Sequence, residues 1–240
     1  MARWRGLLLI GAVGAVVAMV PSAAAGATGN GIATQSAAQI VTTATNATIA
    51  AKSFTIVGYA RSKGSTTGLH ITATSRGDGE GTITLKGLPV QIVKVDSSVY
   101  FRAGRAFWTK NGGASAAGLL ANRWVQFSAA SSNFQSLAQF FSTTQIAQQF
   151  LGSTPKGAVF KKTGLKMVAG QQVIGVTGKD PTNGAVGYFD AATKGSPYVI
   201  RITSSDQGTV GSATFTNYNQ AVHLEAPKGA VNITKLESGS

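Results

Sequence analysis

The stretch TITLKGLPVQIVKVDSSVYFRAGRAFWT, residues 82–109, decides the fold class of this 240-residue chain. Apolar and polar residues alternate along it, so Ile83 and Leu85 face one way and Thr84 the other. Turn-forming residues interrupt the alternation at 87–89, 96–98 and 104. The pattern predicts three or four short strands, at 82–86, 90–95, 99–102 and, as the fourth, 106–109. A meander of this kind has one apolar face, which another layer must cover.

Similar alternation continues on both sides of this stretch. The dipeptide Asn183-Gly184 lies between two alternating segments and is a strong hairpin signal. Further strands are expected at 54–61, 67–75, 123–127, 159–168, 172–177, 185–190, 197–204, 209–218 and 221–225. The chain should therefore form about ten to twelve antiparallel strands.

Two segments have helical periodicity instead. Residues 33–52 carry a narrow stripe of Ala, Thr and Ile at spacings of three and four. Residues 133–151 predict two short helices with aromatic faces, the second capped by the Ser142-Thr143-Thr144 sequence. We therefore expect the α+β class, with a large curved antiparallel sheet and helices packed on its concave face.

The first 25 residues have the features of a secretory signal peptide. Arg3 and Arg5 precede an apolar run at 6–20, and small residues follow at 21–25. The apolar run has about 15 residues, fewer than the roughly 20 needed to span a membrane, although retention as an anchor is the alternative. We expect an exported protein with one domain over residues 26–240, because no internal linker divides the chain.

Charge and cysteine content narrow the function further. Removing Arg3 and Arg5 from the 21 basic residues leaves 19 against 8 acidic ones, a formal charge of +11. This excess either keeps the protein soluble or, in a supporting role, attracts it to an anionic membrane or cell-wall surface. No basic helix or RNA-binding motif indicates nucleic acid. The chain has no cysteine, which excludes thiol catalysis, cysteine-based metal sites and lipidation on cysteine.

The sequence contains no recognisable catalytic or metal-binding pattern. His70 and His223 both fall in expected strands, without a second histidine nearby. The carboxylates lie mostly in turns, and the common hydrolase motifs are absent. A glycine pattern at 77–81 leads into a strand, so it lacks the helix N-terminus that binds phosphate. We expect no enzymatic activity, no cofactor and no metal.

The succession of strand motifs resembles a known family of proteins. The motifs include GTITL, VQIVKVDSSVYFR, RWVQF, GQQVIGV, GYFD, PYVIRI and ATFTNY, spread over residues 33–227. This order resembles the actinobacterial envelope lipoproteins of the LppX/LprG kind, which are related in fold to the lipoprotein carriers LolA and LolB. The resemblance implies an open half-barrel with a hydrophobic cavity between sheet and helices. It also implies a monomeric carrier of lipids or acylated molecules, although the family's usual lipobox cysteine is missing here.

The resemblance implies that apolar side chains line the cavity, and we expect them among residues that would otherwise form a core. The candidates are Ile83, Leu85, Phe101, Trp124, Phe134, Leu137, Phe140, Phe141, Phe150 and Phe215. A buried Phe contributes about 1.5 to 3 kcal/mol whether it contacts protein or an acyl chain, so composition does not separate a pocket from a core. The alternative is a basic cell-surface protein that binds anionic envelope polymers and has a filled core. The identity of the ligand is not specified by the sequence.

Overall fold

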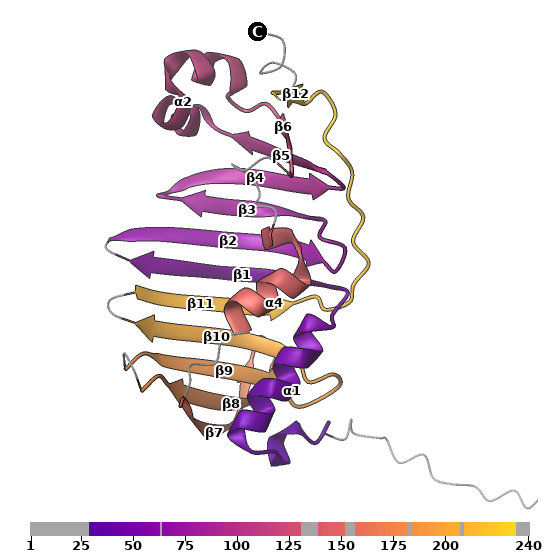
Figure 1. Ribbon diagram of the computed structural model, residues 1–240, viewed down its shortest axis with the longest axis vertical. Coiled ribbons are helices and arrows are strands. Elements are labelled where there is room, and N and C mark those ends of the chain that lie inside the picture. Colours follow the sequence, from indigo (N-terminus) through magenta and orange to yellow (C-terminus); the bar gives the residue numbers. More distant parts are fainter. Residues whose placement is uncertain are drawn as a thin grey trace, which may run out of the picture.

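The computed structural model describes residues 29–62, 64–130, 139–151, 157–181, 184–206 and 209–233. Its framework is one sheet of 12 strands in the order β12-β6-β5-β4-β3-β2-β1-β11-β10-β9-β8-β7 (Figure 1). The strands are β1 (Ser53–Ser62), β2 (Ser65–Thr74), β3 (Gly79–Leu85), β4 (Leu88–Val95), β5 (Ser98–Ala103), β6 (Val125–Ser128), β7 (Val159–Val168), β8 (Gln171–Lys179), β9 (Val186–Ala192), β10 (Val199–Asp206), β11 (Thr209–Thr216) and β12 (Val231–Asn232).

The sheet is curved and open, as the sequence predicted. Strands β7 and β12 form its two edges and do not pair with each other. Every pairing is antiparallel except that of β12 with β6. The helical elements are η1 (Ile32–Thr34), α1 (Ala37–Ile49), α2 (Arg105–Leu120), η2 (Gln139–Phe141) and α4 (Thr143–Leu151). Within the described residues, no helix combines the length and apolar character needed to cross a membrane.

The concave face of the sheet is the face that carries the apolar core. The strand register places Ile56 of β1, Ile71 of β2 and Phe215 of β11 side by side on it, and all three are buried. Helix α1 contacts β7 to β10, and α4 packs against α1 (Figure 1). The predicted arrangement of helices on one face of the sheet is therefore confirmed.

Helix α1 is shorter than the predicted 33–52 segment because its start is fixed by a capping box. The Ser36 hydroxyl accepts from the Gln39 N–H at 3.3 Å, and the Gln39 side chain accepts from the Ser36 N–H at 3.0 Å. At the other end, the buried Thr48 hydroxyl accepts from the Val199 N–H at 3.0 Å. This bond ties the helix to the start of β10.

The segment before α4 is fixed to the sheet by a close contact. Phe141 of η2 is fully buried, and a Cβ added to Gly79 of β3 would lie 2.7 Å from its ring. Thr143, at the start of α4, donates from its hydroxyl to the carbonyl of Ala51 at 3.1 Å. Gly79 thus permits the approach that holds the helical cover over the sheet. The first of the two helices predicted within 133–151 falls largely outside the described residues.

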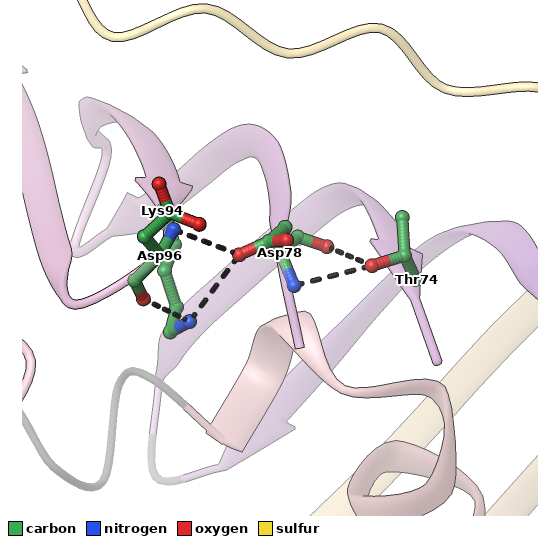
Figure 2. Close-up of polar contacts among 4 residues, drawn as sticks. All are labelled: Thr74, Asp78, Lys94 and Asp96. Atoms are coloured by element: carbon green, nitrogen blue, oxygen red, sulfur yellow. Dashed lines mark hydrogen bonds and ion pairs between the residues drawn. The ribbon is translucent and has the colours of Figure 1, made fainter. Parts of the chain in front are cut away.

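The two ends of the strands differ. At one end, the β2–β3 and β4–β5 turns are joined through Asp78, whose carboxylate accepts from the Asp96 N–H at 3.0 Å and pairs with Lys94 at 3.6 Å (Figure 2). The Thr74 hydroxyl in turn accepts from the Asp78 N–H at 3.2 Å. Residues 217–230 run along this same end toward β12 (Figure 1). We call it the closed edge.

The opposite end is formed by the hairpins β1–β2, β3–β4, β8–β9 and β10–β11 and by the passage from β5 into α2 (Figure 1, left). We call it the open edge. The N-terminal part of the described chain lies at the closed edge, because the Asn30 amide donates to the carbonyl of Ala192 at 2.9 Å and to that of Gly195 at 3.1 Å. The chain therefore enters the fold away from the open edge.

Two predicted strands are wrong. Residues 106–109 belong to α2. The Trp108 ring stacks on the Phe101 ring with the ring centroids 5.1 Å apart, and the Phe107 ring packs edge-on against the same ring with the centroids 6.2 Å apart. A four-residue apolar run does not distinguish helix from strand, and this aromatic packing decides for the helix. Residues 221–225 are not a strand, because Asn217 and Asn219 adopt positive φ angles after β11 and redirect the chain. The short strand β12 was not predicted.

Candidate functional site

A small apolar cavity lies on the concave face over strands β2 to β5. Its volume is about 270 Å³, and Thr67 is the one polar residue among those that line it. Phe107 of α2 and Phe140 of η2 contribute to its walls together with the strand residues. The lining residues are Thr67, Leu69, Ile83, Leu85, Val90, Ile92, Phe101, Phe107 and Phe140. This chamber presents no charged group, so it suits hydrocarbon rather than a polar molecule.

A larger cavity of about 710 Å³ lies over β1 and β8 to β11. Val41 of α1 and Leu151 of α4 line it from the helical side, while Val176, Phe189 and Ile202 line it from the sheet. Lys179 and Asp180 are the charged residues among those that line it. Most of this chamber is therefore also apolar, with its charges at the end of β8.

Glycines hollow the sheet beneath the larger cavity. Gly178, Gly187 and Gly211 line it from three different strands, and the register places all three on the concave face. A Cβ added to Gly187 would come no closer than 3.7 Å to its nearest neighbour, and one added to Gly211 no closer than 3.5 Å. Side chains would therefore fit at Gly187 and Gly211, and their absence leaves space that a filled core would occupy.

The two cavities adjoin. Thr67, Leu69 and Phe140 each line both of them. Their combined space falls within the range of roughly 300–1,000 Å³ that is usual for small-molecule sites. An elongated apolar ligand could therefore extend from one chamber into the other along the concave face.

The position of the mouth follows from residues that line a cavity and are also exposed. Leu85 is 42% exposed and is the last residue of β3, while Lys179 and Thr209 are exposed at the end of β8 and the start of β11. All three lie at the open edge. The cavities therefore reach solvent at the open edge. At the closed edge, the contacts of Asp78 join the β2–β3 and β4–β5 turns.

The predicted site residues divide into several groups. Ile83, Leu85, Phe101 and Phe140 line the smaller cavity. Phe141 and Phe215 are fully buried in the core, and Trp124 is half-buried; none of the three lines either cavity. Phe134 and Leu137 lie outside the described residues, and Phe150 is in α4, where its side chain is not described.

Several lining residues were missed by the sequence reasoning. Leu69, Phe107, Phe160, Phe189 and Ile202 line the cavities, as do the three glycines. The alternation within each strand could have identified Leu69, Phe189 and Ile202, because they share a face with the predicted core residues. Phe107 was missed because its segment was predicted as a strand.

The histidine His70 and the buried carboxylate Asp190 both have structural positions apart from the cavities. The described residues contain no group of three or more His, Cys, Asp or Glu side chains that could hold a metal ion. His70 is exposed on the convex face, paired in register with Val57 and Thr82. Asp190 is buried, but it is paired with Lys166 at 2.6 Å and with Arg201 at 2.9 Å. Its partners neutralise it in a structural cluster away from the cavities.

These features define a class of protein: an open antiparallel half-barrel with an apolar cavity between its concave face and its helices. Solved structures of this class are similar to the chain. The lipoprotein LppX of Mycobacterium tuberculosis has 14% sequence identity and a TM-score of 0.51, over 78% of this chain and 97% of that one. LprF from Mycobacterium bovis has 13% identity and a TM-score of 0.56, over 80% and 97%.

At these identities the likeness establishes the fold, and it confirms the LppX/LprG-like architecture that the sequence resemblance predicted. No protein-family model matches the sequence. No curated protein is significantly similar to it either.

Proposed function

We propose that this protein is a non-enzymatic carrier that holds the hydrocarbon part of a lipid or acylated molecule in its two adjoining cavities. The observation that carries this proposal is the continuous apolar space on the concave face, open at one edge. Burying a methylene group stabilises a complex by about 0.8 kcal/mol, so an acyl chain needs no polar contacts to be retained. The fold shared with the lipoproteins LppX and LprF supports the same function.

The competing function, a basic surface protein that binds anionic polymers, requires a filled core. The glycines beneath the larger cavity count against this alternative, because Leu or Val at Gly187 and Gly211 would fill space that is present. The carrier is therefore the better-supported function.

The decisive experiment is native mass spectrometry of the protein purified from its own host. The carrier predicts an additional mass that organic extraction removes and identifies as an acyl lipid. Delipidated protein should then bind a fluorescent fatty acid saturably, with one site per monomer. Protein that carries no lipid and shows no saturable uptake would refute the proposal.

The proposal also includes the location of the protein. It acts as a single domain over residues 26–240, outside the cytoplasm, after removal of residues 1–25 and without a lipid anchor on cysteine. Intact-mass measurement tests this: the secreted form should begin near Gly26 and show no covalent acyl modification. A form that retains residues 1–25 would instead indicate an anchored protein.

A further inference from the structure

The open edge combines the cavity mouth with exposed basic residues. Arg61, Lys86, Arg105 and Lys179 are all exposed and come from four different connections at this edge. The acidic residues of its described part are Asp180 and Asp206. The chain as a whole is also basic, with 21 basic against 8 acidic residues. The rim of the mouth is therefore attractive to anionic surfaces.

The same edge also exposes apolar side chains. Leu85 is 42% exposed and Val210 is 43% exposed, at the ends of β3 and β11 that face this edge. Tyr59, three residues before the end of β1, and Tyr188, two residues after the start of β9, are also exposed. Basic residues interspersed with apolar and aromatic side chains are typical of surfaces that lie in the interfacial region of a membrane. A soluble polyanion would use the charges alone.

We infer that the open edge is a docking surface for an anionic lipid bilayer, which places the cavity mouth directly against the membrane. The inference relies on the proposed carrier function only to explain why the protein would dock to a membrane. Docking itself is tested independently, because bilayer binding is measured separately from lipid uptake. Charge complementarity selects the anionic surface, and the exposed Leu85 and Val210 select a bilayer rather than a polymer. The N-terminal part of the described chain lies at the closed edge and leaves this surface clear.

The test is flotation of the full mature protein with vesicles of two compositions. Vesicles of phosphatidylglycerol and phosphatidylcholine in equal parts should bind it, and vesicles of phosphatidylcholine alone should not. The double substitution Arg61→Glu with Lys86→Glu should weaken binding at least about tenfold, since each basic residue near an anionic membrane contributes about a factor of five. The matched control is Arg76→Glu with Lys194→Glu, which makes the same charge change at exposed positions of the closed edge. It should bind nearly as well as the wild type.

A second pair of variants tests the apolar contribution. Val210→Asp should weaken vesicle binding, whereas Met167→Asp, at a 65%-exposed residue near the closed edge, should not. Equal effects of the two double charge reversals would mean general electrostatic adsorption and would overturn the inference. Undiminished binding by Val210→Asp, together with equally strong binding to soluble polyglutamate, would indicate a polymer site and would also overturn it.

Lipid uptake separates this inference from the carrier function. A fatty acid delivered from cyclodextrin, without vesicles, should load the Arg61→Glu, Lys86→Glu variant as well as the wild type, while loading from anionic vesicles should slow. If the variant still floats with vesicles, the docking surface is refuted even when lipid uptake is normal. If the wild type floats through this edge and takes up no fatty acid, docking is supported and the carrier is refuted.

Discussion

Leu69 on β2 and Phe140 in η2 both line the two cavities, so these two side chains lie where the cavities adjoin. Leu69 projects from the sheet, and Phe140 belongs to the helical cover that Gly79 and Phe141 fix in place. Together with Thr67 of β2, which also lines both cavities, they show that the junction involves both layers of the fold. Its width should determine whether a single ligand can occupy both chambers.

We predict that Leu69→Trp shortens the longest acyl chain that the protein binds. Leu69 is half-buried beside open space, so a larger ring can enter the junction without displacing the packed core. Binding of short fatty acids should remain within about threefold of the wild type, and binding of long ones should fall at least tenfold. Titration with fatty acids of increasing length provides the measurement. An unchanged profile of affinity against chain length would show that the ligand does not cross the junction.

Gly187→Leu should block the larger cavity at little cost in stability. Its nearest neighbour would lie 3.7 Å from the new Cβ, and the backbone there does not have a positive φ, so neither a clash at Cβ nor backbone strain opposes the change. The melting temperature should stay within a few degrees of the wild type, while uptake of a long acyl probe falls at least tenfold.

The control for this change is Gly68→Leu, which adds the same side chain to the convex face. Its nearest neighbour would lie 3.6 Å away, on Thr84, so the steric situation is comparable. Uptake should be unaffected. Equal loss of binding in both variants, or destabilisation of Gly187→Leu by the roughly 1–3 kcal/mol typical of overpacking, would mean that the space is a packed core.

The sequence predicted most of the sheet and the helices α1 and α4, because their periodicities are strong. The alternation at 82–103 could only fit strands with one buried face, and the resemblance then predicted the half-barrel. The α2 helix was missed because Phe107 and Trp108 are stabilised by long-range contact with Phe101, which local pattern does not contain. Strand β12 has two residues and depends on pairing with β6, so no local signal reveals it.

The cavity was harder to predict than the fold. Aromatic residues drew attention to Phe141 and Phe215, which are fully buried and line neither cavity. The space depends instead on where side chains are absent, at Gly187 and Gly211, and strand pairing brings these two glycines to either side of Ser204 on the same face. The chain has 30 glycines, so composition could not single these two out.

The three residues of the Asp190 cluster, Asp190, Lys166 and Arg201, should contribute unequally to the free energy of unfolding. Asp190 is buried between Lys166 and Arg201, whose side chains are 36% and 38% exposed. Asp190→Ala leaves two cations close together and should lower the free energy of unfolding by about 2–4 kcal/mol. Lys166→Ala or Arg201→Ala leaves the other cation in place and should cost less than about 1.5 kcal/mol.

Urea unfolding at neutral pH measures these three variants. Glu80→Ala, at an exposed strand position, is the control and should change stability by no more than about 0.5 kcal/mol. The account of the cluster would be wrong if removal of either cation cost as much as removal of Asp190.

Tyr218 should make the protein more sensitive to alkali. Its ring stacks on Tyr198 at 4.1 Å, and its hydroxyl donates to the carbonyl of Val199 at 2.5 Å. Burial raises the pKa of Tyr218 above its ordinary value near 10. At pH values below this ordinary pKa, the phenol is neutral in both the folded and the unfolded chain. The stabilising contribution of the buried neutral phenol is therefore fully present there. Above this pKa the unfolded chain ionises first, and stability falls by up to about 1.4 kcal/mol per pH unit.

Tyr218→Phe isolates this effect. At pH 7 the variant should be less stable than the wild type by about 1 kcal/mol, because the Val199 carbonyl loses its donor. Above pH 10 the difference should shrink and then reverse, since Phe does not ionise. Urea unfolding at pH 7, 9, 10 and 11 provides the curves, with Tyr188→Phe, a change at a half-exposed ring on β9, as the control that should keep the alkaline slope of the wild type. A constant difference between Tyr218→Phe and the wild type from pH 7 to 11 would show that the buried hydroxyl does not govern alkaline unfolding.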